Sequence, residues 1–205
     1  MKTGIISGSH RPQSQSEKVA RVVESRLAES AWCTKPWLLA LANNPLPFWD
    51  ESISSGGGAW EDTLPPLREQ VQECDAFVIV TPEWQGMVPS GLKNFFLLWA
   101  AGGELAHKPA LLVSVSASDN GAYPIAELRM SSYKNSRICY LPEHLIVRRV
   151  GSVFNSDGAD NDAKSQAYLS GRLNYCLDML GEYAGAFRQI RASGKVSLDT
   201  YSNGM

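Results

Sequence analysis

The chain has 205 residues, of which 44% are hydrophobic, enough for one sizeable core and too few for two ordinary α/β domains. We therefore expect residues 1–205 to form a single domain. Lys and Arg number 19 against 21 Asp and Glu, for a formal charge of -2. This balance excludes a strongly basic surface, so we expect neither nucleic acid nor an anionic membrane as a partner.

The chemistry-bearing residues show no pattern of a metal site or a hydrolase. The four cysteines have no C-x-x-C pair and no His at metal-ligand spacing, so we expect no metal and reduced thiols. G-x-S-x-G and H-E-x-x-H motifs are absent from the sequence. No apolar run approaches the roughly 20 residues of a membrane span, and the first residues do not resemble a signal peptide. We expect a cytoplasmic protein.

Five short apolar runs are separated by longer segments of helical pattern. Most of the runs do not alternate with polar residues, which is typical of strands buried on both faces of a parallel sheet. The predicted strands are Thr3–Ser7, Trp37–Leu41, Ala76–Thr81, Ala110–Val115 and Leu145–Val150. The predicted helices are Ser16–Ser30, Leu64–Cys74, Gly91–Ala101, Gly121–Ser136 and Asp162–Arg191. The stretch Asn43–Gly58, which contains two prolines and three consecutive glycines, is predicted to be an irregular surface excursion.

Alternating strands and helices predict a doubly wound α/β fold, because parallel neighbours require right-handed crossover connections. For five strands we expect a flavodoxin-like parallel sheet in the order 2-1-3-4-5, with helices on both faces. Ligands of such sheets bind beyond the carboxyl ends of the strands, where the strand order reverses. The loops after the first, third and fourth strands are therefore the candidate site.

The loop after the first strand carries the groups that bind a phosphate. It combines hydroxyl and backbone N–H donors, one guanidinium and the positive end of a helix. The predicted phosphate ligands are Ser9, Arg11, Ser14, Gln15 and Ser16. The alternative is that Ser14 and Glu17 form a capping box and only begin the helix. The loop is neither a Walker loop nor G-x-G-x-x-G, which favours a monophosphate.

The loop after the third strand reads TPEWQGMVPSGLKN over residues 81–94. Its prolines restrict the backbone and Gly86 permits a sharp turn, so N–H groups there could reach a flat polar heterocycle that Trp84 or Met87 covers. The predicted contacts are Pro82, Glu83, Trp84, Gln85 and Gly86. This arrangement suits the isoalloxazine ring of a flavin. The alternative is that Trp84 is an ordinary core residue.

The two loops together resemble the NAD(P)H-dependent FMN reductase family, whose members read G-S-x-R-x-x-S after the first strand and T-P-E-Y-N-x-x-x-P-x-x-L-K-N-x-x-D-W after the third. The matching residues are Gly8, Ser9, Arg11, Ser14, Thr81, Pro82, Glu83, Pro89, Leu92, Lys93, Asn94 and Trp99. The chain departs from the pattern at Trp84 in place of Tyr, Gln85 in place of Asn, and Leu98 in place of Asp. These changes bear on substrate choice more than on FMN binding.

The loop after the fourth strand, residues 116–122, resembles the family's Gly-rich flavin-edge loop. Ser116, Asn120 and Gly121 are predicted to donate to the pyrimidine edge of the flavin, although a plain Asp-Asn-Gly turn requires no ligand. Lys93 and Asn94 are singled out by the resemblance alone. From the residues themselves, the pair could be only a solvated helix face.

The resemblance implies an oxidoreductase that takes a hydride from NAD(P)H onto FMN and passes the electrons to a quinone, a free flavin or a similar small acceptor. No side-chain acid or base is compulsory, so no catalytic residue is predicted. The family commonly dimerises through the helix around Phe95–Trp99, and we expect a homodimer or a homotetramer. The alternatives are a flavodoxin-type electron carrier, which the modest charge disfavours, and an FMN-binding module without turnover, for which Trp84 and Gln85 are the grounds.

Overall fold

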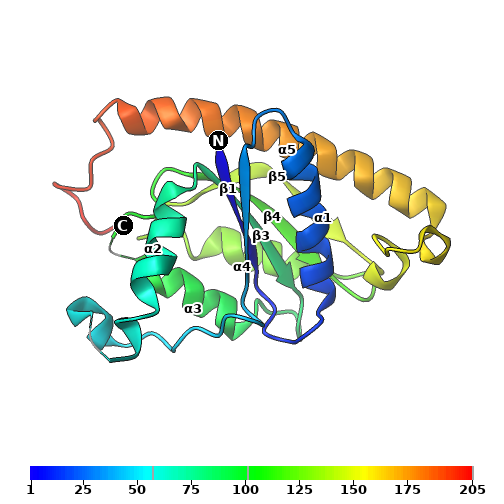
Figure 1. Cartoon of the computed structure of the whole chain (residues 1–205), viewed down its shortest axis with the longest axis horizontal. Helices are drawn as coiled ribbons and strands as arrows, with labels where there is room; N and C mark the ends of the chain where they lie inside the picture. The colour runs from blue at the N-terminus through cyan, green and yellow to red at the C-terminus, as the bar shows by residue number, and fades with distance from the viewer. Residues whose placement is uncertain (57, 101, 205) are drawn as a thin grey trace.

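The computed structural model describes residues 1–56, 58–100 and 102–204, and these form a five-stranded sheet surrounded by helices (Figure 1). All neighbouring strands are parallel, in the order β2-β1-β3-β4-β5. The strands are β1 (Lys2–Ser7), β2 (Lys35–Ala40), β3 (Ala76–Pro82), β4 (Pro109–Val115) and β5 (Cys139–Val147). The predicted flavodoxin-like fold and strand order are confirmed.

Helices cover both faces of the sheet and divide the core into two layers. One layer lies beneath α1 (Gln15–Glu29) and α5 (Ala163–Ala192). The other is formed with α2 (Leu64–Glu73), α3 (Ser90–Leu98) and α4 (Ala122–Met130). Val78 of β3 belongs to the first layer, whereas its neighbour Phe77 belongs to the second. Because successive side chains of a strand point to opposite faces, an apolar residue is needed at every position.

The fourth helix and the fifth strand differ most from the expected bounds. The fourth helix ends at Met130 instead of Ser136, because the hydroxyls of Ser131 and Ser132 donate to the carbonyls of Glu127 and Leu128, at 2.7 and 3.1 Å. Such side-chain bonds compete with continuation of the helix. The fifth strand begins six residues before the expected Leu145. Its first half includes Pro142 and lies at the sheet edge, where proline is tolerated.

The excursion at residues 43–58 is largely irregular, with short 3-10 turns at η1 (Glu51–Ser55) and η2 (Gly58–Trp60). Gly57, in the excursion, and Ala101, at the expected end of the third helix, lie outside the described residues. Among the helices of the described chain, none is both long enough and apolar enough to span a membrane. The four cysteines are free thiols.

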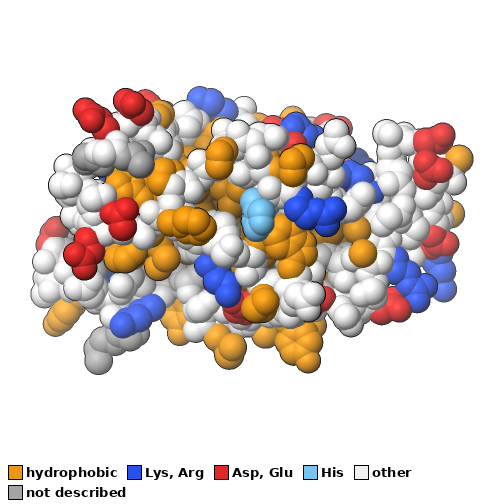
Figure 2. All heavy atoms as spheres, turned by 90° about the horizontal axis from the view of Figure 1, so that it is seen from below, with side chains coloured by type: hydrophobic (Ala, Val, Ile, Leu, Met, Phe, Trp, Pro, Cys, Tyr) orange, Lys and Arg blue, Asp and Glu red, His pale blue; other side chains and the backbone are white. Residues whose placement is uncertain are grey.

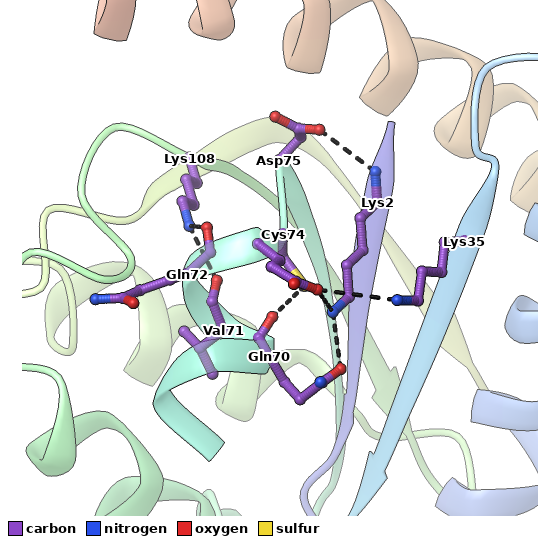
Figure 3. A network of polar contacts seen from close by, with 9 residues as sticks. Lys2, Lys35, Gln70, Val71, Gln72, Cys74, Asp75 and Lys108 are labelled. Atoms are coloured by element: carbon purple, nitrogen blue, oxygen red, sulfur yellow. Dashed lines mark hydrogen bonds and ion pairs between the residues drawn. The ribbon is translucent and has the colours of Figure 1, made fainter. Parts of the chain in front are cut away.

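At the amino-terminal edge of the sheet, two buried lysines hold the end of α2 (Figure 3). Lys108 Nζ donates to the carbonyls of Val71 and Gln72, each at 2.9 Å. Lys2 Nζ donates to the side chains of Gln70 and Glu73 at 2.8 and 2.7 Å. The lysines therefore supply donors to oxygens of the last turn of α2, where intrahelical donors run out. The carbonyl of Val71 also accepts from the N–H of Cys74 at 3.3 Å. Burial lowers the pKa of Lys108 to about 8.

Candidate functional site

The three candidate loops lie together at the carboxyl edge of the sheet, the face seen in Figure 2. The first amide of each loop is fixed to the last residues of a neighbouring strand. Gly8 N–H donates to Val80 at 2.8 Å, and Glu83 N–H donates to Val115 at 3.0 Å. Near the centre of this face a His side chain lies between hydrophobic and basic groups (Figure 2). The sheet thus positions the loops side by side as the sequence predicts.

The first loop leads directly into α1, with Ser14 as the N-cap. Ser14 Oγ accepts from the N–H of Glu17 at 3.1 Å, so half of the predicted capping box forms. The carboxylate of Glu17 is bonded instead to Arg21 Nη2 at 2.7 Å. The acidic side chain closest to the proposed phosphate therefore has a cationic partner, which reduces its repulsion of an anion.

Donors remain available at this helix end. In the described ranges the structure gives no hydrogen-bond acceptor to the N–H groups of Gln15 and Ser16, which belong to the first turn of α1. Ser9 is buried and its Oγ accepts from the N–H of Arg11 at 3.2 Å, while the Arg11 side chain is exposed. Free amides, a helix dipole and a guanidinium are the kinds of group that bind anions.

The second loop contains a tight hairpin turn. Trp84 and Met87 exchange backbone hydrogen bonds of 3.2 and 2.9 Å, and the two residues between them have φ of 55° (Gln85) and 75° (Gly86). Two positive φ values identify a type I′ turn, which fits the twist of the strands on either side. The N–H of Trp84 is used within the turn, whereas Gln85 and Gly86 have no acceptor among the described residues. These two N–H groups are the available donors.

Trp84 is not a core residue. Its side chain is half-buried, and the indole makes an edge contact with the His10 ring, with centroids 4.7 Å apart. His10 belongs to the first loop, so this contact joins the first loop to the second. The interpretation of Trp84 as ordinary core is therefore wrong, and the indole stands at the boundary of two loops.

A buried acceptor in the second loop tests whether a flavin fits. Glu83 Oε1 is buried without a hydrogen-bond partner in the part of the chain that the structure describes. An ionised carboxylate only accepts hydrogen bonds, and an unsatisfied buried acceptor is costly. The ring N–H and ribityl hydroxyls of FMN are donors that a carboxylate here could accept from. The residues present therefore fit FMN, with an anion site at α1 and free amides at the second loop.

The third loop offers fewer donors than expected. The N–H of Ser116 already donates to Val147 at 2.9 Å. Its hydroxyl accepts from the N–H of Ser118 at 3.2 Å and lies 3.3 Å from the Ser118 hydroxyl. Gly121 has φ of 111°, and a Cβ there would lie 2.5 Å from Ile146 Cγ2. Only glycine fits this position, where the loop passes over β5. Arg149 and Asp119 form a two-fold hydrogen-bonded ion pair at 2.7 and 2.9 Å, which braces the loop from outside.

Asn94 does not belong to a solvated face, whereas Lys93 is exposed. Asn94 is buried and bonds to the backbone of the excursion on both sides of Phe48. Lys93 Nζ lies 2.5 Å from Glu127 Oε1, and the other oxygen of Glu127 accepts from the N–H of Val88 at 2.7 Å. Only the resemblance singled this pair out, because their partners are distant in sequence. Both side chains support the loops from α3.

Most of the apolar side chains predicted around α3 are buried in the core of the chain itself. Phe95, Phe96, Leu98 and Trp99 are buried, and in this run only Leu97 is exposed. A partner surface is therefore not needed to explain these residues as a group.

Comparison with known proteins identifies the family of the chain. Residues 1–150 match the family model of the NADPH-dependent FMN reductases. The chain belongs to this family. The quinone reductase of Pseudomonas putida is 30% identical over 169 residues, which cover 80% of this chain and 87% of the relative. The quinone reductase of Escherichia coli K12 is 37% identical over 73 residues, 35% of this chain and 38% of the relative.

Solved structures share the fold of this FMN reductase family member. The flavoenzyme NAD(P)H:(acceptor) oxidoreductase FerB from Paracoccus denitrificans superposes with a TM-score of 0.68 at 20% identity, over 91% of this chain and 98% of that protein. A putative quinone reductase from Klebsiella pneumoniae gives a TM-score of 0.61 at 15% identity, over 88% and 85%. The family assignment makes the chain an NAD(P)H-dependent FMN oxidoreductase, with FMN as cofactor and NAD(P)H as co-substrate.

Proposed function

We propose that the three loops hold FMN with its phosphate at α1 and its ring against the second and third loops, and that the acceptor is a small quinone. The observation that carries the proposal is the set of unpartnered polar groups at one sheet edge: the amides of Gln15 and Ser16, the amides of Gln85 and Gly86, and the carboxylate oxygen of Glu83. Bound FMN supplies the hydride chemistry, which side chains alone do not provide.

The residues of the chain bind, orient and stabilise. Arg11 and the first turn of α1 neutralise the phosphate, while Ser9, Ser14 and Ser16 supply hydroxyls around it. The turn at Gln85 and Gly86 is closed by the two backbone hydrogen bonds between Trp84 and Met87. The free amides of Gln85 and Gly86 would donate to the ring edge of bound FMN and would favour its negatively charged reduced form. Asn120 and Gly121 extend this edge, and Pro82 fixes the approach of the second loop.

A quinone acceptor is supported by the relatives named quinone reductase, two of which align with 80% of this chain. Trp84 and Met87 border the second loop and offer flat or flexible apolar surface for a planar ring. We place the reaction in the cytoplasm, where four free thiols stay reduced.

We propose that a second copy covers the outer surface of α3 and α4. Exposed apolar side chains gather there: Met87, Leu97, Tyr123, Met130 and Tyr133. Of these, Leu97 also lines a cleft of about 390 Å³, together with Phe96 of α3 and Leu128 of α4. Clustered exposed apolar groups typically mark an interaction surface. The expected homodimer, or a tetramer built from it, would bury this surface beside the flavin loops.

Light scattering on wild type and Leu97→Glu tests this proposal. We expect the molar mass of the variant to be that of a monomer.

The decisive experiment is to purify the full chain, record its visible spectrum and titrate it with FMN in a calorimeter. We expect a yellow protein or 1:1 binding, followed by NAD(P)H oxidation that depends on added quinone. A colourless protein that does not bind FMN would refute the proposal. FMN binding without NAD(P)H oxidation would favour a non-catalytic module, and electron transfer only to protein partners would favour a carrier.

A further inference from the structure

Asn94 fixes a short aromatic segment beside the first loop. Its Nδ2 donates to the carbonyl of Pro47 at 2.8 Å, and its Oδ1 accepts from the N–H of Trp49 at 2.8 Å. The Asn94 side chain is 5% exposed, whereas Phe48, between the two bonded residues, is 77% exposed. The amide thus holds the backbone on both sides of Phe48 and leaves its ring outside the core.

This ring borders a pocket of about 270 Å³ that lies beside the first loop. Leu41, Pro45 and Leu46 form an apolar wall, and His10, Ser90 and Asn94 supply the polar groups. The described lining contains no Lys, Arg, Asp or Glu, so the pocket suits an uncharged ring better than a phosphate. Its size approaches the lower limit of small-molecule sites, roughly 300 Å³.

The pocket and the flavin loops share His10. This side chain lines the pocket and also contacts the Trp84 indole of the second loop, at 4.7 Å between centroids. A molecule bound in the pocket is therefore separated from the second loop by one side chain. An extended ligand could occupy both places, whereas a small ligand could occupy only one.

We propose that this pocket binds the adenine ring of the nicotinamide dinucleotide, with Phe48 as a specificity-determining residue. The proposal rests on the proposed function, because it takes the nicotinamide end to lie at the flavin loops. Phe48 and His10 offer aromatic surface for a flat heterocycle, and the Ser90 hydroxyl can pair with its ring nitrogens or amine. A small quinone must itself reach the flavin to be reduced, so it cannot occupy this pocket while it reacts.

Two measurements on the FMN-loaded full chain test the pocket. Calorimetry with ADP-ribose, which carries adenine but no nicotinamide, requires no turnover. Anaerobic stopped-flow reduction compares NADH and NADPH with 1-benzyl-1,4-dihydronicotinamide, which lacks the adenosine half. For Phe48→Ala we expect the affinity for ADP-ribose and the dinucleotide rate constant kred/Kd to fall roughly fivefold to tenfold. The rate constant for 1-benzyl-1,4-dihydronicotinamide, the truncated reductant, should stay unchanged. Phe48→Trp should restore both values.

Tyr201→Ala is the matched control, because Tyr201 is also 77% exposed and its backbone is bonded to Arg137, just before β5 at the opposite edge of the sheet. It should leave both measurements unchanged. Three results for Phe48→Ala would each overturn the proposal. The reduction rate constants for the dinucleotide and the truncated reductant could fall equally, neither could change, or only the rate of the quinone step could fall. A wild-type flavin that no nicotinamide reduces would instead refute the proposed function, and ADP-ribose binding would still decide the pocket.

Discussion

Lys93 Nζ lies 2.5 Å from Glu127 Oε1, while Glu127 Oε2 accepts from the buried N–H of Val88 at 2.7 Å. One carboxylate thus joins α3, α4 and the end of the second loop. The ion pair is partly exposed and should contribute little, about 0–1 kcal/mol. The bond to Val88 matters more, because a buried N–H left without an acceptor costs about 1–3 kcal/mol.

Replacing Glu127 separates these two contributions. Glu127→Ala removes the acceptor of Val88, and we expect the free energy of unfolding to fall by about 1–3 kcal/mol. Glu127→Gln keeps a carbonyl oxygen for Val88 and loses only the ion pair, so we expect a loss below about 1 kcal/mol. Urea unfolding of the two variants measures the difference. Equal losses would show that the ion pair, not the bond to Val88, holds the loop.

Arg11→Ala should weaken FMN binding without changing the fold. A charge-assisted hydrogen bond to a phosphate contributes about 1.5–3 kcal/mol, so we expect Kd to rise roughly tenfold to a hundredfold. Calorimetry measures the affinity, and circular dichroism checks the fold. Arg26→Ala, in the last turn of α1, serves as the control and should bind FMN normally. An Arg11→Ala protein that retains its flavin on gel filtration would contradict the phosphate assignment.

Gly121→Ala should be strongly destabilising. The added Cβ would lie 2.5 Å from Ile146 Cγ2, at a φ of 111° that L residues rarely adopt. Strain of this kind costs on the order of 1–3 kcal/mol. Gly158→Ala is the control, because a Cβ at Gly158 meets nothing within 4 Å and its φ is not positive. Thermal unfolding should show a clear drop for the first variant and almost none for the second.

Lys108 should make stability rise with pH just above neutrality. Burial lowers its pKa to about 8 from an ordinary value of 10.5. Between these values the unfolded chain holds a proton that the native chain has released, so the free energy of unfolding increases as pH rises. The clearest window is about pH 8–9, because the Cys74 thiol, with an ordinary pKa of 9.0 that burial raises to about 12, acts in the opposite direction above it.

Lys108→Met removes this dependence. It also removes the donor to Val71 and Gln72, so we expect lower stability at every pH. The difference from wild type should widen between pH 8 and pH 9, as measured by urea unfolding in matched buffers. A constant difference across that range would show that Lys108 does not titrate there.

The sheet could be predicted because β1, β3 and β4 are buried on both faces and leave apolar runs that few other structures produce. The first half of β5 could not, because Pro142 and polar neighbours conceal a strand whose edge position tolerates them. In the site, the motifs identified the three loops, but they did not show which N–H groups lack a hydrogen-bond acceptor within the protein. The N–H of Ser116 looks available until Val147 is placed beside it, and that pairing depends on the register of β4 and β5.

Asn94 is a second residue whose contacts could not be predicted from the sequence. Its helical neighbours predict a solvent-facing amide, yet its partners Pro47 and Trp49 lie 47 and 45 residues earlier in the chain. Helical periodicity predicts on which face of the helix a side chain lies. It does not predict which distant irregular segment packs against that face. Only the three-dimensional arrangement reveals such a contact.

The family match ends at residue 150, whereas α5 follows it and supplies Leu173, Leu177 and Leu180 to the layer over β4 and β5. A version of the protein cut at that point would keep all three loops but leave Leu111 and Leu145 facing water. We expect such a truncated protein to aggregate before it could be assayed, so the last helix must be retained in any shortened form.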